Sequence, residues 1–422
     1  MAVKNYEEFT LFDMIMPRYQ IDPNKKLRLI STFSGYDSQA LALKYLGVNF
    51  EHHRTCEWAV KSIQALKDLH FSNDNTDYSK EYNLDYIYNY LYNKGISQNY
   101  NEPMKLEQIK RLGEDKARTI YNNIKATKNM VNIQQVKAED LSIVEKDKYE
   151  YLFTYSFPCQ DLSLAGLRKG MKKGESTRSG MLWEVERILE ECKELNAFPN
   201  ILFMENVPEV IGKNNIKDFQ KWIEKLESLG YSNYVECLNS KDYGIPQNRN
   251  RCFMISVLGE YSYKFPLPFK LELRLKDLLE SNIDEKYYLS SKRIKDISEW
   301  KAQQDPLKDI DKEKEICPTL TARGAGEEHS GMILINEDVY EKYDGNGVAM
   351  CHPAGLPSGS YMYQLSNLRI RKLTPRETFR LMGVKDEDFD KIKNNQSDSS
   401  LWHLAGDSIV TSVMYYMFKN LF

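Results

Sequence analysis

One cysteine stands where it could act as a nucleophile. Cys159 follows Pro158 directly after the apolar, strand-like run Tyr151–Tyr155. A thiolate is a strong nucleophile, but a thiol with an ordinary pKa near 8.5 is only a few per cent ionised at pH 7, so it needs a nearby cation or base. A lone cysteine is more often a small buried hydrophobe. The glycine-bearing segment at 165–178, with five basic residues and one acidic residue, could close on phosphates and favours the catalytic interpretation.

Two further polar clusters follow strand-like runs. Glu205 ends the apolar run that begins at Ile201, where burial would raise the carboxyl pKa, although a structural capping role is equally open. Gln247, Arg249 and Arg251 alternate along an extended segment, so their side chains are expected to point one way. Three polar side chains on one face suggest a ligand, and a solvated edge strand is the alternative.

The segment Phe33-Ser34-Gly35-Tyr36-Asp37-Ser38 predicts a turn between a strand and a helix. Its glycine either satisfies the backbone angles of the turn or lets the backbone approach a ligand. Glu57, about 20 residues further on, could accept hydrogen bonds from ribose hydroxyls, and Trp58 could stack on a base. Because the full G-x-G-x-x-G phosphate motif is absent, an adenosine without a pyrophosphate fits better than a dinucleotide.

These residues need a sheet to position them, and the chain supplies an alternation of short apolar runs and helical patterns. That rhythm predicts an α/β fold with a mostly parallel sheet, whose strand ends would bring the polar residues to one crevice. An inserted helical segment is expected at about 70–135, and an irregular second domain after Pro266. The apolar helix in Leu401–Phe422 is expected to pack back on the first domain. The predicted strands are Leu27–Phe33, His52–Cys56, Tyr151–Tyr155, Ile201–Met204, Tyr234–Leu238 and Cys252–Val257.

Composition excludes several classes of protein. The 422 residues suffice for two or three domains, and 41% hydrophobic with 28% charged residues argues against a disordered, collagen-like or membrane-spanning chain. Seven scattered cysteines without a C-x-x-C pair predict reduced thiols and no zinc site, and the N-terminus lacks a secretory signal, so a cytoplasmic protein is expected. A net charge of −3 means that any nucleic-acid surface must be a local patch.

Taken in order, these segments resemble the DNA (cytosine-5)-methyltransferase family of the bacterial or phage type. The resemblance rests on several motifs besides the turn at 33–38 and covers most of the chain. It implies a Rossmann-like, S-adenosylmethionine-dependent methyltransferase domain over 1–262 and 395–422, and a smaller target-recognition domain over 263–394. The motifs are Pro158-Cys159-Gln160, Ser179–Leu182, Glu205-Asn206-Val207, Gln247-x-Arg249-x-Arg251, Arg371–Glu377 and Gly406–Val410.

The resemblance also assigns roles to residues. The catalytic residues would be Cys159, Glu205, Arg249 and Arg251. S-adenosylmethionine would be held by Phe33, Gly35, Tyr36, Ser38, Glu57, Trp58, Asp140, Leu141, Pro158, Leu182, Asp407 and Ile409. Duplex DNA would be contacted by Gln160, Ser163, Arg168, Lys169, Gln247, Thr319, Thr321 and Arg323, and no metal is expected.

The implied mechanism adds the Cys159 thiolate to carbon 6 of a cytosine rotated out of the duplex, with Glu205 hydrogen-bonded to the base. The turn departs from the family's F-x-G-x-G-G, because Asp37 and Ser38 replace its last two glycines, and Asp407 stands where Asn is common. The alternatives are an RNA (tRNA) cytosine-5 methyltransferase and an inactive DNA-binding regulatory homologue; the intact catalytic residues argue against the second. A bacterial or phage-infected cell is the expected setting, in which a cognate restriction endonuclease is a further candidate partner.

Overall fold

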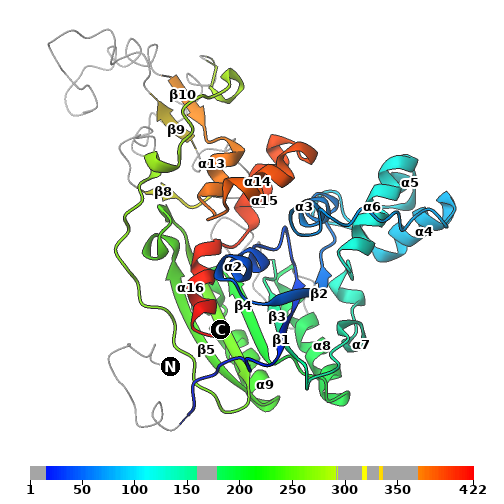
Figure 1. The fold of residues 1–422 in the computed structure, drawn as a ribbon, viewed down its shortest axis with the longest axis vertical. Coiled ribbons are helices and arrows are strands. Elements are labelled where there is room, and N and C mark those ends of the chain that lie inside the picture. Colours follow the sequence, from blue (N-terminus) through cyan, green and yellow to red (C-terminus); the bar gives the residue numbers. More distant parts are fainter. Residues whose placement is uncertain (1–15, 159–177, 291, 293–315, 321–331, 336–368) are drawn as a thin grey trace.

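The computed structural model describes residues 16–158, 178–290, 292, 316–320, 332–335 and 369–422 (Figure 1). Seven of the predicted site residues therefore lie outside the described residues. They are Cys159, Gln160, Ser163, Arg168, Lys169, Thr321 and Arg323.

A six-stranded sheet forms the centre of the fold, with the strand order β2-β1-β3-β4-β7-β5. The strands β2, β1, β3 and β4 run parallel to one another, whereas β7 runs antiparallel to both β4 and β5. This arrangement confirms the predicted mostly parallel sheet and all six predicted strands. The strands span Lys26–Thr32 (β1), Phe50–Cys56 (β2), Tyr149–Tyr155 (β3), Ile201–Asn206 (β4), Tyr231–Asn239 (β5) and Asn250–Leu258 (β7).

Helices cover both faces of this sheet. Successive strand residues face opposite sides, so Phe203 of β4 packs in one core with α2 (Ser38–Leu46) and α16 (Thr411–Lys419), while Leu202 packs in a second core with α8 (Leu182–Glu194) and α9 (Ile216–Ser228). The ring of Phe418 lies 5.3 Å from that of Phe203. The C-terminal helix therefore packs back on the first domain, as predicted.

The predicted helical insert is present and has its own small core. Helices α4 (Leu84–Lys94), α5 (Leu106–Lys110) and α6 (Glu114–Ala126) enclose buried apolar side chains together with Ile63 of α3 (Val60–His70). The insert lies beside the edge strand β2 (Figure 1), where Met130 N donates to the carbonyl of Thr55 at 2.8 Å. The chain leaves the insert through η1 (Ile133–Gln135) and α7 (Ala138–Leu141).

The region after the large sheet is irregular where it is described. It contains two small two-stranded sheets, one of β6 (Gln247–Asn248) with β8 (Cys317–Pro318) and one of β9 (Met332–Ile335) with β10 (Arg369–Lys372). The predicted domain division at 394 stays a prediction. Shorter elements complete the fold: η2 (Arg178–Met181), η3 (Pro208–Ile211), η4 (Ser240–Tyr243), η5 (Leu275–Leu278), η6 (Glu285–Tyr287), α13 (Pro375–Arg380), α14 (Asp386–Ile392), η7 (Lys393–Asn395) and α15 (Asp398–Asp407).

Helices α13 and α14 share the first core with the large sheet. Asp388 of α14 is fully buried, and it accepts hydrogen bonds from Lys44 Nζ at 2.7 Å and from the Tyr45 hydroxyl at 2.9 Å. The segment before 394 is thus fixed directly to α2, which follows the predicted cofactor turn.

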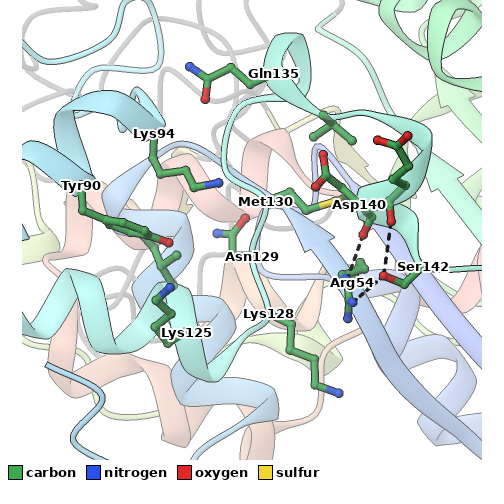
Figure 2. Close-up of a pocket in the computed structure, with 13 residues that line it drawn as sticks. Arg54, Tyr90, Lys94, Lys125, Lys128, Asn129, Met130, Gln135, Asp140 and Ser142 are labelled. Atoms are coloured by element: carbon green, nitrogen blue, oxygen red, sulfur yellow. Dashed lines mark hydrogen bonds between the residues drawn. The ribbon is translucent and has the colours of Figure 1, made fainter. Parts of the chain in front are cut away.

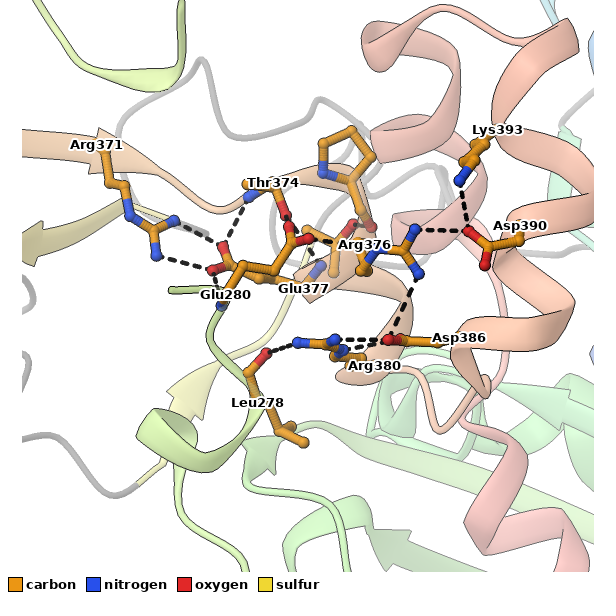
Figure 3. A network of polar contacts seen from close by, with 12 residues as sticks. Leu278, Glu280, Arg371, Thr374, Arg376, Glu377, Arg380, Asp386, Asp390 and Lys393 are labelled. Carbon is orange, nitrogen blue, oxygen red and sulfur yellow. Dashed lines mark hydrogen bonds and ion pairs between the residues drawn. The ribbon is translucent and has the colours of Figure 1, made fainter. Parts of the chain in front are cut away.

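A buried ion pair joins β10 to α13 (Figure 3). Both guanidinium NH groups of Arg371 donate to the two carboxylate oxygens of Glu377 at 2.7 Å, and both side chains are 0% exposed. Thr374 caps the helix, Pro375 takes its first position and Glu377 accepts from the Thr374 backbone N at 2.8 Å. The sequence pattern of a capped helix start is confirmed.

No helix among the residues that the structure describes is long and apolar enough to span a membrane.

Candidate active site

Four parallel strands bring the predicted site residues to one edge of the sheet. The carboxyl ends of β1, β2, β3 and β4 lie next to one another because these strands are parallel. Strand β1 leads into Phe33 to Gly35, β2 into Glu57, and β3 into Ser156 to Pro158. Glu205 lies at the carboxyl end of β4 itself. The edge of an open α/β sheet at its carboxyl ends is where such folds bind ligands.

Glu57 ties the ends of β1 and β2 together. Its Oε2 accepts from Gly35 N at 2.9 Å and its Oε1 accepts from Ala59 N at 2.7 Å. Burial raises the pKa of Glu57 to about 7, against the effect of these backbone donors. Gly35 has φ +55, and a Cβ built there would meet no atom within 4 Å. Space therefore remains beside the backbone of this turn, next to a carboxylate.

Asp37 occupies the position of the second glycine in the family's turn motif and adopts a positive φ there. Its φ is 58, a left-handed conformation that aspartate tolerates better than most residues. Its side chain caps α2 by accepting from Ala40 N, accepts from Ser31 Oγ at 3.1 Å, and places Oδ2 3.3 Å from His52 Nε2. At this position, where the family commonly has glycine, Asp37 thus combines a left-handed backbone with a side chain that caps α2.

The terminal motif meets this turn. Ser408 Oγ donates to Ser38 Oγ at 3.0 Å, and Ile409 is buried in the first core. Tyr36 points away from solvent into that core, with its ring 5.3 Å from that of Phe379. Asp407 is half exposed, and its carboxylate lies 3.0 Å from His403 Nε2.

The remaining predicted cofactor residues are distributed around the same edge. Leu141 and Leu182 are fully buried in the second core, and half-buried Trp58 packs against the core of the insert. Asp140 is exposed, and its Oδ2 accepts from Lys137 N at 2.8 Å. Pro158 is partly buried at the last described position before Cys159.

Glu205 has two polar neighbours at the end of β4. Arg251 Nε lies 3.1 Å from its Oε1, and Ser156 Oγ donates to its Oε2 at 2.5 Å. The carboxyl side chain is 8% exposed and that of Arg251 is 16% exposed. The motif-based prediction missed Ser156, and it also missed the contact in which Asn206 Nδ2 donates to Phe157 O at 3.0 Å. The available signal was position, because Ser156 directly follows the last residue of β3 and Asn206 is the last residue of β4.

The expectation that Gln247, Arg249 and Arg251 share one face is wrong for the third residue. Gln247 is buried, with Nε2 donating to Leu381 O at 2.8 Å and Oε1 accepting from Leu320 N at 3.2 Å. The side chain of Arg249 also turns toward Leu320, whereas Arg251 turns to Glu205. The strict alternation fails because the chain turns between β6 and β7, where Arg249 N donates to Gln247 O at 3.0 Å.

Arg249 binds backbone carbonyls of two segments far along the chain. Its guanidinium donates to Leu320 O at 2.7 Å, to Gly406 O at 2.9 Å and to Ser408 O at 2.7 Å, and the residue is 3% exposed. It therefore links Leu320 to the terminal motif. Of the predicted recognition residues, only Thr319 is described besides Gln247, and its Oγ1 donates to Asn248 O at 2.5 Å.

The sheet order and the polar residues at its carboxyl edge define a Rossmann-like methyltransferase fold. Solved structures agree with this class: a methyltransferase from Entamoeba histolytica matches with a TM-score of 0.61 at 17% identity, covering 94% of this chain and 98% of that one. The Dnmt2 methyltransferase of S. pombe matches with a TM-score of 0.60 at 15% identity, covering 93% and 97%. At such identities the likeness is one of fold.

Sequence comparison defines the family. The model of the C-5 cytosine-specific DNA methylases matches residues 108–422. The type II methyltransferase M2.ScrFI of Lactococcus lactis subsp. cremoris is 34% identical, covering 94% of this chain and 99% of its own length. The orphan methyltransferase M.SssI of Spiroplasma monobiae is 37% identical, covering 92% and 96%. The chain belongs to the C-5 cytosine-specific DNA methylase family and is a DNA cytosine-5 methyltransferase.

Methyltransferases of this family use S-adenosylmethionine, and the residues at the edge fit its nucleoside part. Gly35 leaves open space beside the backbone, and each Glu57 oxygen that binds a backbone N–H retains a second lone pair for a hydroxyl donor.

Proposed function

We propose that this enzyme transfers a methyl group from S-adenosylmethionine to carbon 5 of a cytosine within a specific duplex DNA sequence, through a covalent bond between Cys159 and carbon 6 of a base rotated out of the helix. The observation that carries the proposal is the position of Glu205. It lies beside Arg251 and Ser156, at the end of the strand next to the one that leads into Cys159.

The thiol is needed because carbon 5 of cytosine is a poor nucleophile. Addition of the Cys159 thiolate to carbon 6 forms an S–C bond and makes carbon 5 enamine-like, so that it can attack an electrophilic methyl group. S-adenosylmethionine supplies that methyl group from its sulfonium. Loss of the proton from carbon 5 to a base, followed by elimination of the thiolate, then restores the aromatic ring.

Glu205 provides the recognition of the base in this proposal. One oxygen of its carboxyl group would accept from the exocyclic amine of cytosine. When protonated, the other oxygen would donate to N3, so that the negative charge developing in the ring during thiolate attack is dispersed. Thymine presents a carbonyl and an N–H at the same positions and would be rejected. Arg251 and Ser156 hold the carboxyl group in place, which makes them positioning residues.

A base stacked in a duplex cannot reach this edge of the sheet. Rotating it out costs a few kcal/mol, and contacts to the DNA phosphates would offset that cost. Binding should accordingly weaken steeply with salt. Arg168 and Lys169 remain the proposed phosphate contacts within the segment that follows Cys159.

The cofactor would be held by the turn and its neighbours. The Glu57 carboxylate would take the ribose hydroxyls, Trp58 and Asp140 would adjoin the adenine, and the backbone at Phe33 and Gly35 would lie along the ligand. The contact between Ser38 and Ser408 supports a contribution from the terminal motif.

The test compares Cys159→Ala with Cys237→Ala, a matched change on β5, in transfer of label from tritiated S-adenosylmethionine to duplex DNA and to tRNA. We expect the wild type and Cys237→Ala to label cytosine in DNA, and Cys159→Ala to lose more than about a thousandfold in turnover while still binding cofactor. Full turnover by Cys159→Ala would remove this thiol from the mechanism. Labelling of tRNA alone would favour the RNA enzyme, and DNA binding without labelling by the wild type would favour an inactive homologue.

A further inference from the structure

A cavity of about 340 Å³ lies between the helical insert and the outer edge of β2 (Figure 2). Its walls come from α4, α6, the segment 128–130 and α7, together with Arg54 of β2. Of the proposed cofactor residues only Asp140 lines it, and none of Phe33, Gly35 or Glu57 does, so the cavity is distinct from the cofactor turn. Its volume is in the range of small-molecule sites.

Positive side chains dominate this cavity. Arg54, Lys94, Lys125 and Lys128 line it, against only two carboxylates, those of Glu139 and Asp140. The carboxylate of Asp140 already accepts from Lys137 N at 2.8 Å. The lining therefore carries an excess of two positive charges.

Three of the lining cations are lysines, and Lys94 and Lys125 are close enough to influence each other. Within the described part of the chain, none of their ammonium groups forms an ion pair, and Lys128 Nζ reaches only the carbonyl of His52 at 3.4 Å. Lys125 lies over the ring of Tyr90, 4.6 Å from its centroid. Burial and the charge of Lys94 lower the pKa of Lys125. An anion bound between Lys94 and Lys125 would offset the repulsion between their two positive charges.

Arg54 is held in position at the cavity wall. Its Nε donates to Asp140 O at 3.0 Å, and its two NH groups donate to His53 O at 2.8 Å and to Ser142 Oγ at 2.7 Å. Because three hydrogen bonds already fix this guanidinium, an anion that binds to it would cost little further side-chain entropy. Lysine binds phosphate as a point charge. It lacks the planar, bidentate geometry with which arginine matches a carboxylate.

We infer that this cavity is a phosphate-binding site, separate from the catalytic centre, which takes a phosphate group either of the DNA that flanks the target or of a free nucleotide.

The experiment uses the full chain without S-adenosylmethionine, so that its outcome does not depend on the proposed chemistry. Inorganic pyrophosphate is titrated calorimetrically into the wild type, into Lys94→Gln/Lys125→Gln, and into the control Lys110→Gln/Lys116→Gln, which removes the same charge from exposed positions of the insert. We expect at least about a tenfold loss of affinity in the first variant and none in the control. Absence of pyrophosphate binding to the wild type at millimolar concentration, or equal binding by both variants, would overturn the inference.

A second arm separates the two sources of phosphate. Binding of a duplex of A·T pairs only is measured over a range of salt concentrations. If the cavity holds a DNA phosphate, Lys94→Gln/Lys125→Gln reduces the slope of log K against log salt by about one to two more than the control does. If it holds a free nucleotide, the two slopes agree while pyrophosphate binding is still lost. Should the double variant melt early, the exposed single change Lys128→Gln replaces it, with a smaller loss of affinity expected.

Discussion

Glu205 Oε1 lies 3.1 Å from Arg251 Nε, at the point where β4 and β7 run side by side and where the strand before Cys159 ends nearby. Two residues earlier, Arg249 donates to three backbone carbonyls. The two arginines of one motif therefore have different binding partners. Arg251 contacts the carboxyl group that is proposed to bind the base, and Arg249 connects Leu320 to the terminal motif.

The first prediction concerns Arg249. Replacing it by Gln removes three charge-assisted hydrogen bonds and leaves buried carbonyls without donors, so we expect a loss of about 3 kcal/mol in the free energy of unfolding, measured in urea. Arg251→Gln should instead lower turnover by about a hundredfold, because the Glu205 carboxyl group loses its orientation. An Arg249→Gln enzyme that unfolds normally but has lost turnover would assign this residue to the substrate.

The second prediction is a pH dependence of cofactor binding. In the proposed cofactor site, the ionised Glu57 carboxylate would accept from the ribose hydroxyls, and burial raises the pKa of Glu57 to about 7. Affinity for S-adenosylmethionine should therefore weaken about tenfold as the pH falls from 8 to 6. Glu57→Gln should bind more weakly with a flat profile over that range. The same pH slope in the variant would show that another group titrates.

The raised pKa of Glu57 has a matching effect on stability. Between its ordinary value of 4.5 and about 7, the folded protein binds this proton more tightly than the unfolded chain does. The contribution of Glu57 to stability should therefore decrease as the pH rises through that window. The free energies of unfolding of the wild type and Glu57→Gln, measured at pH 5 and pH 8, should diverge accordingly, and parallel values would contradict the assignment.

The third prediction separates backbone shape from capping at Asp37. Asp37→Ala loses the cap of α2 and also places alanine at φ 58, so it should cost about 2 kcal/mol. Asp37→Gly restores the family's residue, keeps the backbone unstrained, and should cost less than about 1 kcal/mol. Urea unfolding of the two variants measures this difference. Equal losses would mean that the left-handed backbone is not a source of strain here.

The fourth prediction concerns the buried pair of Arg371 and Glu377. Glu377→Gln leaves the Arg371 charge without its counter-ion in a site that is 0% exposed, so about 3 to 5 kcal/mol of stability should be lost. The double variant Arg371→Met/Glu377→Gln should recover part of that loss, because the unpaired charge is gone. Thermal or urea unfolding provides the measurement, and a double variant less stable than Glu377→Gln would refute this account.

The sheet, the insert and the C-terminal helix were predictable because apolar runs and helical periodicity are local signals. The different directions of Arg249 and Arg251 were not, since the direction of Arg249 depends on contacts far along the chain. Arg249 is the clearest example: its partners Leu320, Gly406 and Ser408 come from distant segments, and alternation alone could not distinguish its direction from that of Arg251. Ser156 carried no motif of its own, and only the adjacency of β3 and β4 places it at Glu205.

The most direct test of the central proposal is mass spectrometric mapping of the peptide that becomes linked to a duplex carrying 5-fluorocytosine at its target, in the presence of S-adenosylmethionine. Fluorine at carbon 5 cannot leave as a proton does, so the bond between sulfur and carbon 6 should persist. We predict that the linked peptide contains Cys159 and that Glu205→Gln slows its formation. A stable adduct at any other residue, or active methylation without an adduct, would contradict the covalent mechanism.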